Sequence, residues 1–117
     1  MSAQPHSGAV SAAKLRAHAP VFAALGDETR LALVAKLSSG ASLSITELTT
    51  GASVTRQAIT KHLRVLEEAG LVHGVRRGRE SRYQLSPEPL EEARRVLNLI
   101  SQQWDHALAR LKAFVEE

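Results

Sequence analysis

The spacing of hydrophobic and polar positions predicts a mainly helical chain with one small β-hairpin. Apolar residues recur at intervals of three and four over most of its length, which is the spacing of one helix face. The first helix begins after Ser11, and Pro20 must either kink it or begin a second piece of it. A second helix follows Asp27 and ends near Gly40. Its apolar stripe consists of Leu31, Val34, Ala35 and Leu37.

The next segment predicts two helices separated by a turn of about four residues, which is a helix-turn-helix arrangement. Ser44 and Glu47 have the spacing of a capping box, so a short third helix begins there. Thr55 is the expected N-cap of a fourth helix, over about 55–69, and Gly70 ends it.

A hairpin and a long helix complete the pattern. Residues 72–76 and 81–85 flank Gly78 at a spacing typical of a β-hairpin, so we expect a two-stranded ribbon over about 72–85. After two prolines, a last helix runs over about 89–116. Its apolar stripe consists of Leu90, Ala93, Leu97, Ile100, Trp104, Leu108, Leu111 and Val115.

The last helix is too long for the rest of the chain. About 28 residues at a rise of about 1.5 Å span about 42 Å, whereas a compact chain of this length is about 34 Å across. Because the protruding part keeps its apolar stripe, it needs a partner surface, most simply a second copy in a two-fold dimer. The alternative is a kinked helix folded back over the first helix. The expected dimer-interface residues are Leu15, Phe22, Leu97, Ile100, Trp104, Leu108, Leu111 and Val115.

Composition limits the possible chemistry. The chain has 117 residues, 44% of them hydrophobic, and no cysteine, which excludes disulfides, thiolate metal sites and a cysteine nucleophile. We expect residues 1–10 to be a flexible tail and residues 11–117 to form one domain. Since no apolar run approaches about 18 residues and the start is unlike a signal peptide, we expect a cytoplasmic protein without a membrane span.

Positive charge is concentrated in the middle of the chain. Residues 53–84 contain seven Lys and Arg against three Glu, a net charge of +4, although the whole chain carries only +3. A basic segment on a nearly neutral protein is typical of a nucleic-acid surface. On charge alone, a solvated charged face explains the segment equally well.

The fourth helix has one apolar and one polar face. At about 100° per residue, Ile59, Leu63 and Leu66 share the side that faces the core. The opposite side carries amide, hydroxyl and cationic side chains that can read base edges or bind phosphate, and the first turn adds a site favourable to phosphate. A solvated helix face is the bland alternative, but the adjacent basic hairpin favours DNA. The candidate DNA-binding residues of this helix are Thr55, Arg56, Gln57, Thr60, Lys61 and Arg64.

The hairpin adds four arginines within seven residues. An arginine-rich ribbon can follow a phosphate backbone or enter a narrow minor groove; alternatively, the charges protect exposed strand edges. The candidate DNA-binding residues of the hairpin are Arg76, Arg77, Arg79 and Arg82. We expect His62 to pack or hydrogen-bond at the core boundary and Tyr83 to be anchored on the sheet.

No pattern of catalytic or cofactor-binding residues is evident. The sequence has no Ser-His-Asp arrangement, no phosphate-binding glycine loop and no histidine pair at a metal-ligand spacing. We therefore expect neither an enzyme nor a bound cofactor.

The order and spacing of four motifs resemble the ArsR/SmtB-type winged-helix repressors, over roughly residues 20–115. The motifs are FAALGDETRL at 22–31, ITEL at 45–48, VTRQAITKHLRVLEEAGLV at 54–72 and GRESRYQL at 78–85. The resemblance implies a winged helix-turn-helix fold, a dimer built on the first and last helices, and a repressor released from its operator by a signal. It implies DNA reading by Arg56, Gln57, Thr60 and Lys61.

Two departures from the family bear on its metal sites. Many relatives carry a cysteine pair at the start of the third helix, where this chain has Thr46 to Thr49. Another family site uses Asp, His and Glu or His ligands on the last helix, paired across the dimer. Here Asp105 and His106 are adjacent, so they point about 100° apart, and no second histidine follows, only Glu116 and Glu117. We therefore expect no metal site and a dimeric repressor of a palindromic operator that does not sense metal. The alternatives are a winged-helix protein-interaction module and a metal-responsive repressor with its site on the last helix.

Overall fold

The computed structural model describes residues 10–116, which form five helices and three strands around one small core. All but the last residue of the predicted flexible tail, 1–10, lies outside the described residues. In chain order the elements are α1 (Ala12–Leu25), α2 (Glu28–Leu37), β1 (Leu43–Ser44), α3 (Ile45–Thr49), α4 (Arg56–Glu68), β2 (Val72–Arg77), β3 (Glu80–Leu85) and α5 (Pro87–Glu116).

Side-chain caps fix the starts of the first four helices, as predicted. The side chains of Ser11, Asp27, Ser44 and Thr55 each accept a hydrogen bond from the backbone N–H three residues later. At α3 the capping box is complete, because the Glu47 carboxylate also accepts from the Ser44 backbone N–H at 3.2 Å. Each cap satisfies a donor that the helix itself cannot.

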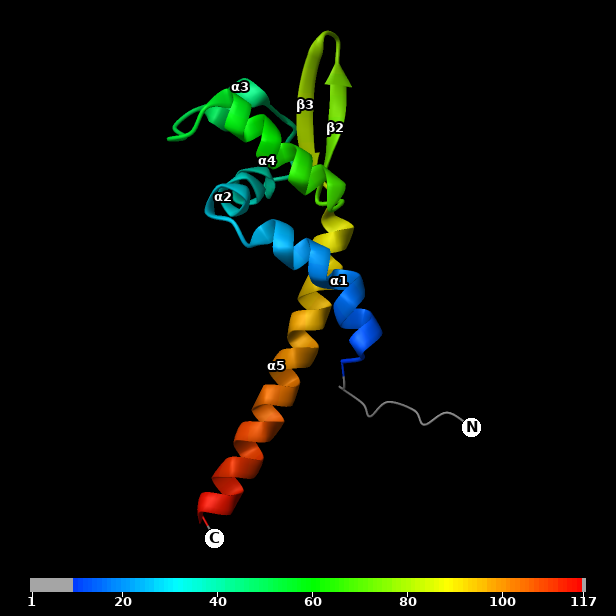
Figure 1. Ribbon diagram of the computed structural model, residues 1–117, viewed down its shortest axis with the longest axis vertical. Coiled ribbons are helices and arrows are strands. Elements are labelled where there is room, and N and C mark those ends of the chain that lie inside the picture. The colour runs from blue at the N-terminus through cyan, green and yellow to red at the C-terminus, as the bar shows by residue number, and fades with distance from the viewer. Residues whose placement is uncertain (1–9, 117) are drawn as a thin grey trace, which may run out of the picture.

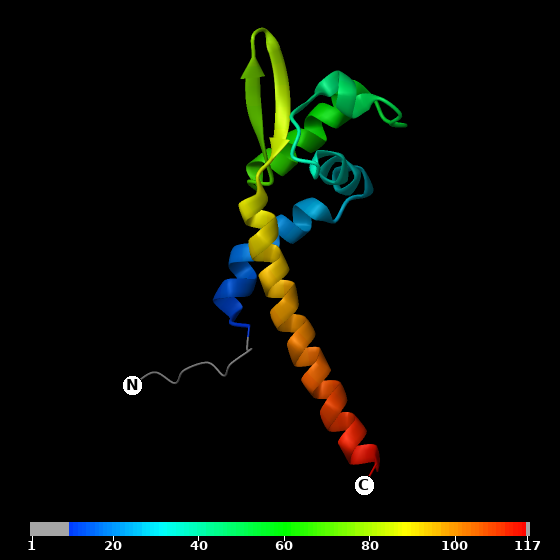
Figure 2. The ribbon, with the colours of Figure 1, turned by 180° about the vertical axis from the view of Figure 1, so that it is seen from behind.

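Pro20 lies inside α1, which is one helix of 14 residues rather than two pieces. The helix changes direction within its length, as Figures 1 and 2 show from opposite sides. Such a bend is expected because proline lacks the N–H for the helical hydrogen bond and crowds the preceding turn.

The core lies where α1, α2, α3, α4, β2 and the start of α5 meet. Ile59, Leu63 and Leu66 of α4 are buried in it, as predicted. The predicted stripe of α2 is partly wrong: Leu31 is 54% exposed, Ala35 is also exposed, and Leu33 is buried instead. The apolar residues of α2 are spread over most of its faces, so their spacing alone could not show which face is buried. The complete buried cluster is Val21, Ala24, Leu33, Val34, Leu37, Leu48, Ile59, Leu63, Leu66, Leu71, Val72 and Ala93.

The sheet has three antiparallel strands in the order β1-β3-β2, so the predicted two-stranded ribbon is corrected by one strand. The hairpin pairs Val72 with Leu85 at its base and Arg77 with Glu80 at its tip. Gly78, with φ of 64°, begins the tight connection, a conformation that glycine adopts without strain. The third strand is only Leu43–Ser44, too short to show an alternating pattern in the sequence.

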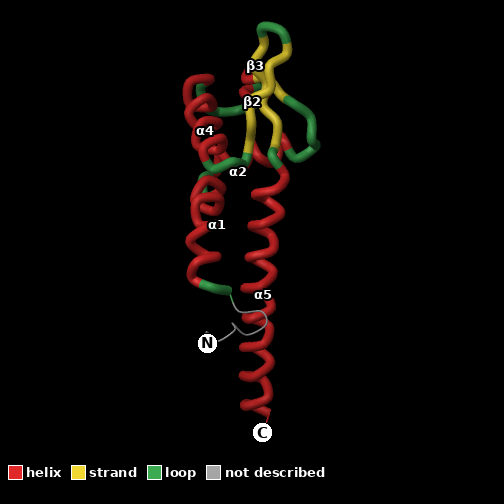
Figure 3. The backbone as a smooth tube through the Cα atoms, turned by 90° about the vertical axis from the view of Figure 1, so that its right-hand side faces the viewer, coloured by secondary structure: helices red, strands yellow, loops and turns green. Residues whose placement is uncertain are grey.

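The last helix is continuous over 30 residues from Pro87, two residues earlier than predicted. The alternative of a helix folded back over α1 is therefore wrong. Its first part lies beside α1, and the rest projects away from the domain (Figure 3). From Ser101 to Glu116 every residue except Ala107 is exposed. The radius of gyration of 19.0 Å and extents of 65 × 38 × 21 Å reflect this projection, since a compact chain would have a radius near 13 Å.

Candidate nucleic-acid interface

The polar face of α4 is exposed and carries three side chains with no protein partner. Gln57, Lys61 and Arg64 lie at spacings of four and three, so they share one side of the helix. Within residues 10–116, none of the three makes a side-chain hydrogen bond or ion pair. Amide and cationic donors in this state are available to a ligand without breaking any internal contact.

The other three predicted residues of α4 are engaged locally. The Thr55 hydroxyl caps the helix by accepting from the Ala58 backbone N–H at 3.1 Å. The Thr60 hydroxyl donates to the Arg56 backbone carbonyl at 2.9 Å. The Arg56 guanidinium donates to the Thr46 hydroxyl at 3.0 Å and so links α4 to α3. Thr55 and Arg56 nevertheless remain exposed at the N-terminal end of α4, which favours anions.

The hairpin stands at the same end of the molecule as α4, opposite the C-terminus of α5 (Figure 1). Arg76, Arg77 and Arg79 are exposed around its tip, and none of them has an ion pair within the described residues. The polar face of α4 and these three arginines together make one cationic end of the molecule.

Arg82 differs from its three neighbours because its side chain points inward. It is 16% exposed, and its guanidinium donates to the Ser42 carbonyl at 2.7 Å, the Ser42 hydroxyl at 3.1 Å and the Glu47 carboxylate at 2.9 Å. It also pairs with Glu80. These contacts join β3 to Ser42, the residue before β1, and to α3.

Within this cluster, Arg82 and the Glu47 carboxylate stabilise each other's charged forms. The hydrogen bond to Glu80, followed by the charges of Glu47 and Glu80, raises the pKa of Arg82 above its ordinary value. Hydrogen bonds from the Ser44 backbone and hydroxyl, and then the charge of Arg82, lower the pKa of the Glu47 carboxyl. Sequence reasoning missed this role because β1 and its pairing with β3, which bring Ser42 and Ser44 to the cluster, were not predicted.

A second set of polar contacts connects α4 to the junction of α1 and α2. The central residue of these contacts is Arg30, which sequence reasoning missed. Its guanidinium donates to the Ala24 carbonyl at 2.6 Å and lies 3.3 Å from the His62 imidazole. The Asp27 carboxylate is 3.7 Å from the same imidazole. The hydrogen bond from the Arg30 backbone N–H is the main cause that lowers the pKa of Asp27. His62 thus bonds at the core boundary, and Tyr83 packs half-buried against the core, both as predicted.

The residues predicted for a dimer interface form an exposed apolar strip along α1 and α5. Trp104 is 63% exposed, and Phe22 is half-buried. Where α1 crosses α5, Leu15, Ala19, Phe22, Val96, Leu97 and Ile100 line an apolar groove of about 360 Å³. Beyond that groove, the strip continues through Leu108, Leu111 and Val115, and nothing within residues 10–116 covers it.

Comparison with known proteins decides the family. Residues 25–75 match the model of a helix-turn-helix domain. The HTH-type transcriptional regulator YuzN of Bacillus subtilis is 44% identical over 77 residues, covering 61% of this chain and 84% of that protein. The solved structure of an ArsR-like transcriptional regulator from Rhodococcus sp. RHA1 is 41% identical, with a TM-score of 0.73, over 87% of this chain and 95% of that one. The chain belongs to the ArsR/SmtB-type winged-helix regulators.

A third relative matches almost the whole length of this chain. The solution structure of the homodimeric winged helix-turn-helix DNA-binding domain of Mb0332 from Mycobacterium bovis is 25% identical, with a TM-score of 0.61, over 94% of this chain and 95% of that one. The protein is accordingly a DNA-binding transcriptional regulator with a winged helix-turn-helix fold. The second helix of the helix-turn-helix, here α4, is named the recognition helix in this fold, and the hairpin, here β2–β3, is named the wing.

Within residues 10–116, no three His, Cys, Asp or Glu side chains lie close enough to hold a metal ion. None of the helices over the same residues is long and apolar enough to cross a membrane.

Proposed function

We propose that the protein is a homodimeric, sequence-specific repressor that binds palindromic double-stranded DNA. The observation that carries the proposal is the alignment of the unpaired side chains of Gln57, Lys61 and Arg64 on one face of α4. The recognition helix lies in the major groove, and the wing rests on the adjacent backbone or minor groove.

The unpaired side chains of α4 match the chemistry of base edges. A glutamine amide fits adenine with two hydrogen bonds, and lysine or arginine fits the acceptors of guanine. Thr60 reads a base edge or a thymine methyl group, and Thr55 and Arg56 contact phosphate at the N-terminal end of the helix.

The wing arginines divide into two roles. Arg76, Arg77 and Arg79 are unpaired and hold phosphates, so they add affinity for any sequence. Arg82 is a positioning residue: its guanidinium is occupied by Ser42, Glu47 and Glu80, and it holds the wing against α3.

Pairing through α1 and α5 accounts for the exposed apolar strip. A second copy related by a two-fold axis would cover Leu97, Trp104, Leu108 and their neighbours. The homodimeric state of the Mb0332 domain supports this arrangement. A two-fold dimer presents two recognition helices to half-sites about 34 Å apart, one turn of the duplex, which requires a palindrome.

Support for repression comes from a relative: the arsenical resistance operon repressor of Escherichia coli is 37% identical over 67 residues. The absence of cysteine from the sequence supports a signal other than a soft metal ion.

The deciding experiment is selection of bound duplexes from a random pool by the full chain. We expect a palindrome whose half-sites are about ten base pairs apart. Fluorescence anisotropy with the selected and a scrambled duplex then measures the specificity ratio. Equal affinity for both duplexes would overturn the proposal, and retention of an acidic protein partner in the presence of excess duplex would favour a protein-interaction module.

A further inference from the structure

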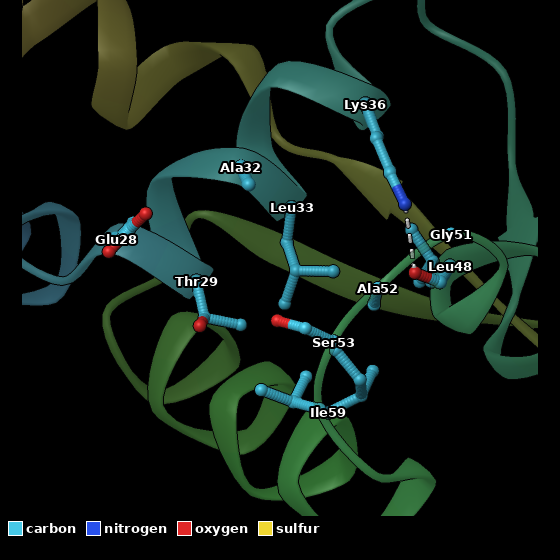
Figure 4. A pocket seen from close by; sticks show the side chains of 11 residues that line it. Glu28, Thr29, Ala32, Leu33, Lys36, Leu48, Gly51, Ala52, Ser53 and Ile59 are labelled. Carbon is cyan, nitrogen blue, oxygen red and sulfur yellow. Dashed lines mark hydrogen bonds between the residues drawn. The ribbon is translucent and has the colours of Figure 1, made fainter.

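A cavity of about 450 Å³ lies between α2 and the turn that joins α3 to α4 (Figure 4). Its apolar wall is formed by Leu33, Leu48 and Ile59, whose side chains also belong to the buried core. The volume lies within the range of pockets that take small organic molecules, about 300–1,000 Å³. The cavity is separate from the DNA-reading face of α4 and from the groove between α1 and α5.

Two hydroxyl groups lie at the cavity without protein partners. The side-chain hydroxyls of Thr29 and Ser53 make no hydrogen bond within residues 10–116. Figure 4 shows the Ser53 hydroxyl directed toward the space between Thr29 and Leu33. An apolar wall with a few polar groups beside it is the usual composition of a small-molecule site.

Lys36 supplies the positive charge of the cavity. Its ammonium group donates to the backbone carbonyls of Leu48 and Thr50, each at 3.1 Å. No carboxylate pairs with it in the described part of the chain. The other charged residue of the lining, Glu28, lies at the opposite side of the cavity from Lys36 (Figure 4).

We propose that this cavity binds a small organic carboxylate with an apolar ring or chain, and that Lys36 receives the carboxylate. A carboxylate adds the attraction of opposite charges to the hydrogen bond, which a neutral carbonyl lacks, so a carboxylate competes well for this ammonium group. The apolar body lies against Leu33 and Ile59, and the hydroxyls of Thr29 and Ser53 satisfy further polar groups.

Occupation of this site changes the part of the fold that sets the recognition helix. The carbonyls that Lys36 holds belong to the last turn of α3 and its C-cap, and the chain continues from there to the Thr55 cap of α4. Gly51 in this turn has φ of 77° and is exposed, and a Cβ atom built on it would meet nothing within 4 Å, so the turn borders open space there. A ligand that draws Lys36 away from α3 favours a different placement of the turn and lowers DNA affinity. This regulatory role rests on the proposed function, whereas the binding site itself does not.

The binding test uses three probes that share one ring and differ in charge: benzoate, benzamide and benzylamine. They are titrated into the full chain without DNA, and backbone amide resonances are followed by NMR. We expect benzoate to shift the amides of residues 28–36 and 48–54, with affinity about tenfold higher than benzamide, the difference expected for one charge-assisted hydrogen bond. Stronger binding of benzylamine, or shifts confined to other regions, would overturn the proposal.

Three variants locate the site. Lys36→Met removes the charge while keeping a long side chain, and we expect a loss of about tenfold in benzoate affinity. Ala32→Leu fills the cavity from the lining of α2 with a strong helix former and leaves Lys36 in place. It should abolish benzoate shifts, which keeps the test decisive if Lys36→Met fails to fold. Lys112→Met, at a lysine 76% exposed on α5, is the matched control and should bind benzoate as the wild type does.

The regulatory role is tested by adding the selected duplex to the same titrations. Benzoate should weaken duplex binding by the wild type but not by Ala32→Leu, and the duplex should weaken benzoate binding by the same factor, as linkage requires. Benzoate binding without any effect on the duplex would overturn the regulatory role. A chain that binds benzoate at this site but no duplex would instead refute the proposed function and leave the site intact.

Discussion

The end of the molecule that carries α4 and the wing exposes cations and amides, whereas the far half of α5 exposes leucine, tryptophan and phenylalanine. Both surfaces stand clear of the core, at opposite ends of a molecule 65 Å long. Charged side chains such as Lys61 are stable in water without a partner, but a row that includes Trp104, Leu108 and Leu111 is not typical of a monomer. The two ends therefore differ in how much they need a partner: the apolar end needs a permanent one, and the cationic end can bind and release.

The largest effect is expected from breaking the apolar end. Leu108→Glu places a charge in the centre of the exposed strip of α5, where a second copy would bury it without a partner. We expect a monomer in analytical ultracentrifugation and a loss of about a hundredfold or more in affinity for a palindromic duplex, because the gain from two linked sites is lost.

The matched control for this change is Gln102→Glu. It adds the same charge to the same helix on the side opposite the apolar strip. A Leu108→Glu protein that remained a dimer, or a Gln102→Glu protein that dissociated, would contradict pairing through this strip.

A smaller effect separates two kinds of residue within the cationic end. Lys61→Ala should relax base preference at one position of each half-site, with a loss of about ten- to a hundredfold for the preferred base. Arg79→Ala should weaken binding to all duplexes alike and reduce the slope of log affinity against log salt by about one. Affinities of both variants over a set of single-base duplexes and several salt concentrations measure the difference. Identical profiles would remove the distinction between the recognition helix and the wing.

Much of the helical framework could be predicted because its determinants are local. The caps at Ser11, Asp27, Ser44 and Thr55 lie within three residues of the groups that they bind. The core face of α4 was also correct, since its polar and apolar sides are sharply divided. On α2, by contrast, the apolar residues do not form one stripe, and the buried position proved to be Leu33 rather than Leu31.

What the sequence could not predict depends on contacts between distant residues. Arg82 is surrounded in the sequence by exposed arginines, yet its partner Ser42 lies 40 positions earlier. That contact exists because the two-residue strand β1 pairs with β3, and such a short strand has no visible period. The same holds for the cavity, whose wall combines α2 with residues of α3 and α4.

A smaller effect again distinguishes Arg82 from the other arginines of the wing. Arg82→Met removes the guanidinium that joins β3 to Ser42 and Glu47, so we expect a melting temperature lower by a few degrees. Arg79→Met removes an exposed, unpaired guanidinium and should leave the melting temperature unchanged. In salt titrations with DNA the two variants exchange roles, because only Arg79→Met should lower the slope of log affinity against log salt. If Arg82→Met lowered the slope as well and left melting unchanged, Arg82 would be a DNA contact after all.

The smallest expected effect is the dependence of stability on the Glu47 carboxylate. Its pKa is lowered in the folded protein, first by the hydrogen bonds from Ser44 and then by the charge of Arg82. A group with a lowered pKa stabilises the fold at pH values above its ordinary range, and this contribution is lost as the pH falls through the folded-state pKa. Glu47→Gln should therefore melt below the wild type at neutral pH, and the difference should shrink on acidification. Asp27 and Glu91 also have lowered pKa values, so their protonation in acid destabilises the wild type and Glu47→Gln alike. The quantity to follow is therefore the difference in melting temperature between these two proteins.

Calorimetry of the two proteins between neutral and acid pH measures that difference. Asp105→Asn, which removes an exposed carboxylate with no ion pair in the described chain, is the control and should differ from the wild type by the same small amount throughout. A constant difference for Glu47→Gln as well would mean that Ser44 and Arg82 bind the neutral amide as well as the carboxylate. In that case the joint between the wing and α3 would depend on shape and hydrogen bonding, and its charge would serve only to orient Arg82.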